Sequence, residues 1–187
     1  MAAMSEISDR YRKVAAGFTA EVEAVPPDRW SSPSPCDGWT ARDVVGHLID
    51  AHDHFLANVD RSVPRTVTVD ADPLAAWVDA CDAMAAALGD PEVSRTEYDS
   101  PFGAQRFEDS ANRFVTNDVL VHTWDLATAV GHDVTLDPDE VATASAAYRA
   151  LGDNVRNPRV FGDEVPAPAG ADAQEELLAF TGRDPRA

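Results

Sequence analysis

Residues 114–130 read FVTNDVLVHTWDLATAV, and their apolar side chains recur at the spacing of an α-helix. On a helical wheel, Asp118, His122 and Asp125 fall in the middle of the apolar face, which should be buried. An isolated buried carboxylate is costly unless it is paired or bound to a metal ion. Asp118 and His122 point the same way, so one divalent ion would satisfy both. Asp125 would bind the ion as well, or would orient one of its ligands.

The same three residues also fit a second interpretation, a hydrogen-bonded polar cluster that fixes helix packing. His122 would then pair with Asp118 or Asp125 and no metal ion would be involved. An acid and a histidine four residues apart form a weak motif, and the spacing alone favours neither interpretation. A third ligand from another part of the chain would favour the metal ion.

Three histidines on the helix expected to begin at Thr40 are candidates for that third ligand: His47, His52 and His54. The apolar residues of this helix place His52 in the centre of its buried face, whereas His47 and His54 lie just outside one edge. Helical periodicity therefore favours His52 as the inward histidine. His52 is equally compatible with a core histidine whose hydrogen bonds are satisfied within the protein.

Capping residues, prolines and glycines mark the ends of the other elements. The predicted helices cover, in order, residues 5–25, 40–59, 73–89, 109–130, 138–151 and 172–181. Residues 93–108 are expected to be irregular, with a short hairpin around residues 100–103. The Pro- and Gly-rich residues 157–170 are expected to form a surface loop.

Several amphipathic helices in one chain predict an all-α protein, a helix bundle whose cofactor sites lie between facing helices. We expect a single domain over residues 1–187, because the sequence contains neither an internal repeat nor a domain linker. Hydrophobic residues make up 44% of the chain, which is enough for a packed core.

The charge of the chain restricts its partners. With 33 acidic and 15 basic residues, the formal net charge is -18. Such a surface repels phosphate backbones and anionic lipids, so neither nucleic acid nor a membrane is an expected partner. The sequence shows no signal peptide and no apolar stretch near the roughly 20 residues of a membrane span. We therefore expect a cytoplasmic protein.

Five further residues are expected to be structural. Cys36 and Cys81 are too few for a disulfide framework or a cysteine-rich zinc site, and Cys81 falls on an apolar helical stripe. For Cys36, in a loop, a structural role is favoured over a reactive one. Trp39 and Trp124 are expected to be packing aromatics, and Arg183 a surface arginine or a helix-end contact.

Three segments carry a resemblance to a known family. Residues 37–48, DGWTARDVVGHL, look like the Gly-Trp-Thr…His-Leu opening of DinB-like proteins. More closely, they resemble the N-terminal metal-binding domain of mycothiol-dependent maleylpyruvate isomerase. Residues 118–127, DVLVHTWDLA, are similar to the same domain, and residues 180–185, FTGRDP, are typical of one actinobacterial branch. The resemblance covers nearly the whole chain.

This resemblance implies an up-and-down bundle of four helices, with short additional helices, that binds one divalent metal ion through three side chains. The family ligands map onto His47, Asp118 and His122, and we adopt this set although the helical wheel favours His52. The isomerases usually have glutamate where this chain has Asp118, so the shorter side chain requires a closer approach to the ion or weaker binding. They also carry a C-terminal domain that this sequence does not show, which speaks against maleylpyruvate isomerisation itself.

Two histidines and one carboxylate leave coordination positions open, as catalytic zinc sites do. The ligands suit Zn²⁺ best and are also compatible with Ni²⁺ or Fe²⁺. We therefore expect a metal-dependent thiol S-transferase or isomerase. The resemblance implies mycothiol as the small-molecule thiol, reacting with a small electrophile. The alternative is a non-catalytic metal- or ligand-binding bundle, as a monomer or a homodimer.

Overall fold

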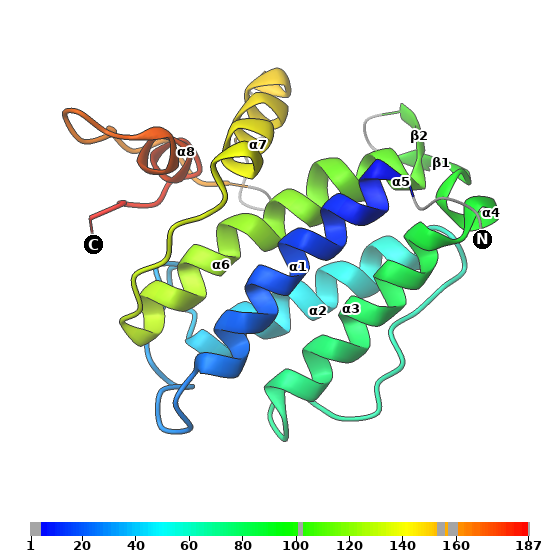
Figure 1. Ribbon diagram of the computed structural model, residues 1–187, viewed down its shortest axis with the longest axis horizontal. Coiled ribbons are helices and arrows are strands. Elements are labelled where there is room, and N and C mark those ends of the chain that lie inside the picture. The colour runs from blue at the N-terminus through cyan, green and yellow to red at the C-terminus, as the bar shows by residue number, and fades with distance from the viewer. Residues whose placement is uncertain (1–4, 101–102, 153–155, 157–160, 187) are drawn as a thin grey trace.

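A computed structural model describes residues 5–100, 103–152, 156 and 161–186 as a mostly helical fold with one small hairpin. Four long helices form a bundle (Figure 1): α1 (Glu6–Ala24), α2 (Ala41–Ala57), α3 (Pro73–Gly89) and α6 (Asn117–Val130). Both α1 and α2 pack against α3 and α6. The predicted all-α bundle is confirmed.

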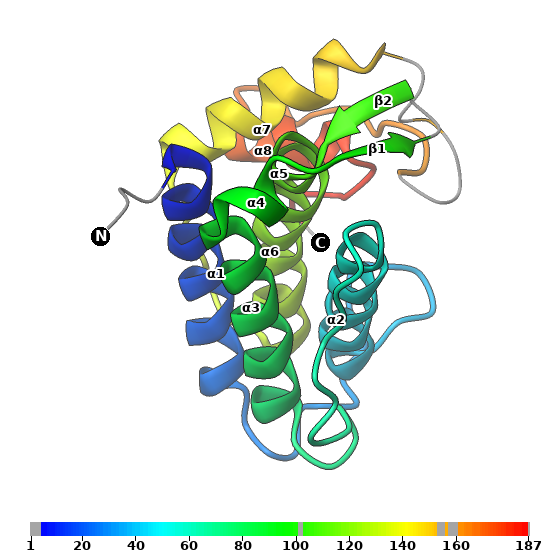
Figure 2. The same ribbon diagram turned by 90° about the vertical axis from the view of Figure 1, so that its right-hand side faces the viewer.

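The bundle helices run in two directions. Helices α1 and α6 run one way, and α2 and α3 run the other way (Figure 1, Figure 2). Because α2 and α3 are parallel, the alternating up-and-down order that the resemblance implies is not kept between them. Residues 58–72 instead return along the bundle from the end of one helix to the start of the other (Figure 2). The antiparallel packing of α2 against α6 is the contact that positions the candidate site.

Side-chain caps fix where three of the bundle helices begin. Ser5 accepts a hydrogen bond from the Ser8 N–H at the start of α1, and Asp72 caps α3. At the start of α2, Thr40 and Asp43 form a reciprocal capping box. These three helices begin within one residue of the predicted starts, because each cap depends only on residues three positions apart.

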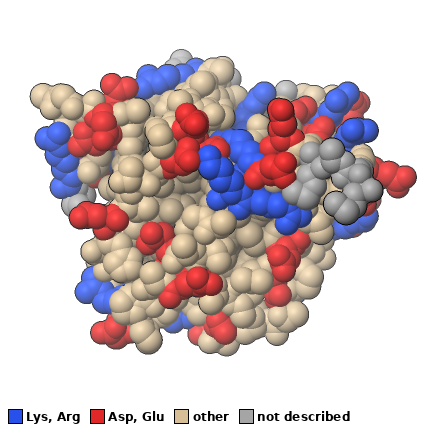
Figure 3. All heavy atoms as spheres, viewed as in Figure 1, with Lys and Arg blue, Asp and Glu red and all other residues tan. Residues whose placement is uncertain are grey.

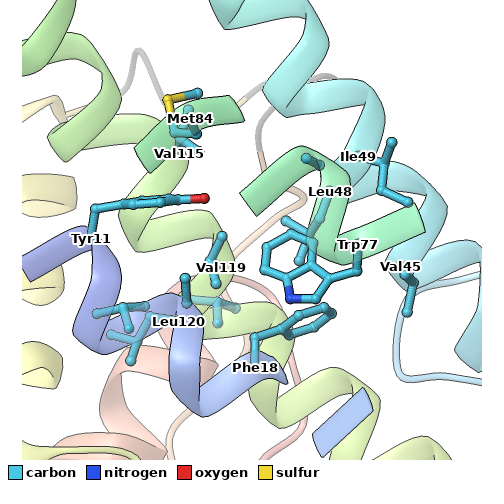
Figure 4. Packing of buried hydrophobic residues seen from close by; sticks show 14 of the residues in the cluster. Tyr11, Phe18, Val45, Leu48, Ile49, Trp77, Met84, Val115, Val119 and Leu120 are labelled. Carbon is cyan, nitrogen blue, oxygen red and sulfur yellow. The ribbon is translucent and has the colours of Figure 1, made fainter. Parts of the chain in front are cut away.

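The core of the bundle is filled by apolar side chains from all four helices (Figure 4). Phe18 of α1 packs edge-on against Trp77 of α3, with ring centroids 4.7 Å apart, and both side chains are fully buried. Leu48 of α2 and Val119 of α6 are completely buried in the same cluster. The four helices thus share one core, and α2 and α6 are held in a fixed relation by it.

His52 is a core histidine. It is fully buried, its Nδ1 lies 2.6 Å from the Leu48 carbonyl oxygen, and its Nε2 lies 2.8 Å from the Tyr11 hydroxyl. Burial lowers the pKa of His52 to about 4, so the ring is neutral near pH 7. Nδ1–H then donates to Leu48, and Nε2 accepts from Tyr11. The helical wheel correctly predicted that His52 points inward, and the interpretation as a satisfied core histidine is confirmed.

The predicted helix over residues 109–130 forms as three consecutive parts. They are α5 (Phe107–Ser110), the π-helix η1 (Ala111–Thr116) and α6. A π-helical turn holds more residues than an α-helical one, and such turns are frequent near functional sites. Sequence periodicity did not predict η1, because the wheel assumes 3.6 residues per turn throughout.

The remaining elements lie around the bundle. The short helix α4 (Pro91–Ser94) leads into β1 (Glu97–Ser100), which pairs antiparallel with β2 (Gly103–Arg106). The predicted hairpin is confirmed, and its turn at Pro101 and Phe102 lies outside the described residues.

Helix α7 (Pro138–Ala150) packs against α6 and against α8 (Ala173–Phe180). Of the predicted loop over 157–170, residues 157–160 lie outside the described part of the chain. No helix in the described ranges is both long and apolar enough to cross a membrane. On the face shown in Figure 3, acidic side chains are widely spread and basic side chains lie among them.

Candidate metal centre

Asp118 lies between two imidazole rings from two helices. Its Oδ2 is 3.1 Å from Nε2 of His47 on α2, and its Oδ1 is 3.4 Å from Nε2 of His122, one turn further along α6. The two rings meet edge-on, with centroids 4.9 Å apart. Ligand atoms of all three residues lie within 4.8 Å of one another. The structure therefore brings together the three residues that were predicted to bind a metal ion.

The spacing of these atoms fits a small divalent ion. Ligand atoms about 2 Å from a tetrahedral zinc ion lie about 3.3 Å from one another. The separations from Asp118 to His47 and His122, 3.1 and 3.4 Å, lie on either side of that value. Direct packing of α2 against α6 provides the close approach that an aspartate requires in place of a longer glutamate.

The cluster formed by His47, Asp118 and His122, here called the triad, is closed on one side and open on the other. The exposed fraction of the side chain is 5% for His122, 25% for Asp118 and 35% for His47. An ion bound by the triad would therefore have protein behind it and solvent in front of it. Open coordination positions of this kind distinguish catalytic zinc sites from closed structural ones.

Asp118 and His122 stabilise each other's charged forms. Burial would raise the pKa of Asp118, but the His122 charge and hydrogen bonds with His122 and His47 hold that pKa far below its usual value. Burial would lower the pKa of His122, but the Asp118 charge and hydrogen bonds with Asp118 and Asp125 raise it well above its usual value. The raised pKa favours the imidazolium form of His122 in the metal-free protein, and a metal ion must then displace its Nε2 proton.

Asp125 contacts the other nitrogen of the His122 ring. Its Oδ2 lies 2.7 Å from Nδ1, and its side chain is completely buried. Arg183, from the segment after α8, donates from Nη2 to the same oxygen at 2.8 Å and from Nε to Oδ1 at 3.2 Å. Burial would raise the pKa of Asp125, but the hydrogen bond with His122 and the Arg183 charge lower it to about 2. Asp125 thus contacts the Nδ1 side of the His122 ring, whereas Asp118 lies on the Nε2 side.

The expectation that Arg183 is a surface arginine is wrong. Only 11% of its side chain is exposed, because the guanidinium is drawn in by the buried Asp125 carboxylate. Its Nη1 also donates to the Thr181 carbonyl at 2.9 Å, so the expected contact with a helix end does form. Nothing local in the sequence around residue 183 indicates this partner, which is 58 positions away.

A tight loop before α2 brings two more side chains to the site. Pro33 and Thr40 form an isolated bridge, and Gly38 has a φ of 75°, which favours glycine. The Trp39 ring lies 4.8 Å from the His47 ring and stacks at 6.0 Å on the His122 ring, centroid to centroid. Trp39 is therefore a packing aromatic, as predicted, and the side chains against which it packs are two of the triad.

Cys36, in the same loop, lies behind His122. Its Sγ is 4.0 Å from His122 Nδ1 and 3.4 Å from Asp125 Oδ2, so these three residues form a second group within metal-binding distance. However, Arg183 Nη2 lies 2.8 Å from Asp125 and 3.7 Å from Cys36. The positive charge at this position is already provided by the guanidinium, so the triad is the better candidate for an ion.

Two cavities lie elsewhere. One of about 260 Å³ lies between α2 and residues 63–69, and another of about 850 Å³ lies beside β2 and η1. Their lining includes none of the three triad residues. Neither cavity gathers metal ligands comparable with the triad, so we place the candidate site at the contact between α2 and α6.

Comparisons with known proteins identify a family for most of the chain. Residues 11–127 match the family model described as the mycothiol maleylpyruvate isomerase N-terminal domain. Two proteins from two strains of Mycobacterium tuberculosis, each named as an uncharacterized protein, are 33% identical to this chain over 177 residues. The alignments cover 90% of this chain and 93% of each relative. No solved structure is significantly similar.

Proposed function

Because the chain belongs to the mycothiol maleylpyruvate isomerase N-terminal domain family, we propose that it is a metal-dependent thiol S-transferase or isomerase. One divalent ion, Zn²⁺ in preference to Ni²⁺ or Fe²⁺, would be bound by His47, Asp118 and His122. The observation that carries the proposal is the Asp118 carboxylate between the Nε2 atoms of two histidines. The family suggests mycothiol as the thiol and a small electrophile as its partner.

Each residue around the ion has a physical role. A divalent ion with open positions lowers the pKa of a bound thiol or water and so supplies a nucleophile near neutral pH. Asp118 compensates one of the two positive charges, and the remaining charge attracts an anionic group. Trp39 covers the two imidazoles and restricts their movement. Nucleophilic chemistry of this kind needs reduced thiols, which fits the cytoplasm.

Metal analysis of protein purified without a histidine tag tests the site. We expect one equivalent of metal in the unmodified chain and loss of the metal in His47→Ala. Two matched variants should keep it: His54→Ala, an exposed histidine on the same helix, and His52→Gln, in the core. A metal retained in His47→Ala, or absent from the unmodified chain after incubation with Zn²⁺, would overturn the proposed site.

A thiol-conjugation assay tests the activity. The metal-loaded protein is incubated with mycothiol or other small thiols and a panel of electrophiles, and conjugate formation is followed. We expect turnover that depends on both metal and thiol and that is lost in His122→Ala with the helical content unchanged. Full turnover in His122→Ala would contradict the proposal.

The alternative is a non-catalytic metal-binding bundle, and one observation favours it. A general acid or base beside the triad would have to come from a nearby ionisable residue, and both His52 and Asp125 are engaged elsewhere. His52 is hydrogen-bonded within the core, and Asp125 is paired with Arg183. Stoichiometric metal binding without turnover across the whole panel would support this alternative. Sedimentation of the metal-loaded and metal-free protein would then show whether the ion stabilises a homodimer.

A further inference from the structure

We infer that Asp125 and Arg183 are positioning residues that fix the His122 ring with Nε2, rather than Nδ1, toward the other two triad residues. The inference rests on the proposed function only in taking the triad as a metal site. It assigns a role in metal binding to the segment after α8, which lies beyond residues 11–127.

The contact between Asp125 and His122 fixes the position of one ring proton. An ionised carboxylate only accepts hydrogen bonds, so Asp125 Oδ2, at 2.7 Å, requires a proton on Nδ1 of His122. The lone pair available for a metal ion is then on Nε2, which faces Asp118 at 3.4 Å. Metal-binding histidines commonly donate their second nitrogen to a carboxylate in this way, which sets both tautomer and ring orientation.

Arg183 keeps Asp125 in its charged form. Its carboxylate is completely buried, and a buried carboxylate is stable only when it is paired. Arg183 meets it with a fork in which Nη2 reaches Oδ2 at 2.8 Å and Nε reaches both oxygens at 3.2 and 3.3 Å. Without this fork, Asp125 would take up a proton or turn away from His122, and the tautomer would no longer be imposed.

A tight turn after α8 brings Arg183 to Asp125. The Arg183 N–H donates to the Leu178 carbonyl at 2.9 Å, which turns the chain back at the end of α8. Gly182 has a φ of 86°, and an added Cβ there would lie 3.0 Å from the Asp163 carbonyl oxygen. Glycine is therefore required at 182 for this turn. The turn of the C-terminal segment thus places the Arg183 guanidinium against Asp125, on the Nδ1 side of His122.

Zinc affinity, measured by competition with a chromophoric chelator, tests the inference. We expect Asp125→Asn and Arg183→Met each to weaken Zn²⁺ binding by about 10- to 100-fold. Arg186→Met is the matched control, because Arg186 lies on the same segment but pairs with Glu175 at the surface. Its affinity should equal that of the unmodified chain.

A second measurement separates positioning from general stability. Nitrogen chemical shifts of the zinc-loaded protein report which His122 nitrogen carries the proton, and we expect Nδ1–H in the unmodified chain and loss of this single state in Arg183→Met. The thermal midpoint of each metal-free variant is recorded alongside. Should Asp125→Asn fail to fold, Arg183→Lys keeps the buried positive charge but loses the fork, and its affinity should fall between those of the unmodified chain and Arg183→Met.

The outcomes distinguish the inference from the proposed function. If the unmodified chain does not bind Zn²⁺, the proposed function fails first. If the unmodified chain binds Zn²⁺ and Arg183→Met binds it equally well, with the same His122 tautomer, the inference alone is wrong. A lowered thermal midpoint with unchanged zinc affinity would also overturn it, because the pair would then stabilise only the fold.

Discussion

His47 and Asp118 are 71 residues apart in the chain, yet Nε2 of one lies 3.1 Å from Oδ2 of the other. The contact joins the exposed edge of α2 to the buried face of α6, and it places the only carboxylate of the triad between the two imidazoles. Loss of the negative charge at residue 118 should therefore affect metal binding before it affects the fold.

Replacement of Asp118 separates charge from shape. Asp118→Asn keeps the size of the side chain but removes its negative charge, so we expect loss of stoichiometric Zn²⁺ binding. Asp118→Glu keeps the charge and restores the acid that is usual in the isomerases, so binding should persist. Metal content after gel filtration measures both. Equal metal content in Asp118→Asn and the unmodified chain would contradict a role for this carboxylate as a ligand.

Metal binding should depend on pH through His122. The raised pKa of His122 means that the metal-free site holds a proton on Nε2, and a divalent ion must displace it. The apparent affinity should therefore fall as pH falls, by about tenfold per pH unit where one proton is displaced. Calorimetry in buffers of different ionisation enthalpy counts the protons released. Binding without proton release would contradict the charged state of His122.

Stability should depend on pH through His52. Its pKa is about 4 in the folded protein and about 6.5 when unfolded, so the unfolded chain takes up a proton first as pH falls. The contribution of the neutral ring is complete above about pH 6.5 and is lost toward pH 4, by about 3 kcal/mol in total. Denaturant unfolding of metal-free protein across this range measures it.

A matched pair of variants isolates this contribution. His52→Gln cannot take up a proton, so its free energy of unfolding should vary less with pH between about 4 and 6.5. His54→Gln, on the exposed face of the same helix, should leave the pH dependence unchanged. The same slope in His52→Gln and the unmodified chain would show that another group is responsible.

The helices could be predicted from the sequence because their signals are local. Ser5, Thr40 and Asp72 cap helices within a few residues of themselves, and Gly131, with a φ of 80°, ends α6 where the sequence predicts. The π-helix η1 and the return of residues 58–72 along the bundle were not predicted. Both depend on how helices pack against one another, which leaves no fixed pattern in the sequence.

The candidate site could be predicted only in part for the same reason. Asp118 and His122 are ionisable residues on an apolar helical face, which is a local signal. His47 lies at the edge of α2, where periodicity cannot distinguish a ligand from a surface residue, and only the family resemblance selected it. Arg183 and Cys36 reach the site through tertiary contacts, so their positions behind His122 became visible only in the fold.

Cys36 distinguishes the triad from the second group of potential ligands, which is formed by Cys36, His122 and Asp125. Its sulfur lies on the Nδ1 side of His122, at 4.0 Å, whereas the triad uses Nε2. An ion in the triad should therefore have no sulfur ligand. The guanidinium of Arg183 lies 3.7 Å from the thiol and already provides a positive charge on that side of the ring. Cys36→Ser should keep both the metal content and the affinity of the unmodified chain.

Cobalt substitution provides the direct measurement. Co²⁺ bound by nitrogen and oxygen ligands alone lacks the intense near-ultraviolet absorption of a cobalt–thiolate bond, and we expect no such band in this protein. Arg183→Met is the informative comparison, since it removes the cation that lies between Asp125 and Cys36. A thiolate band in the unmodified chain that disappears in Cys36→Ser would show that the metal ion is bound on the Nδ1 side of His122, by Cys36, and not by the triad. The triad would then be no more than a hydrogen-bonded cluster.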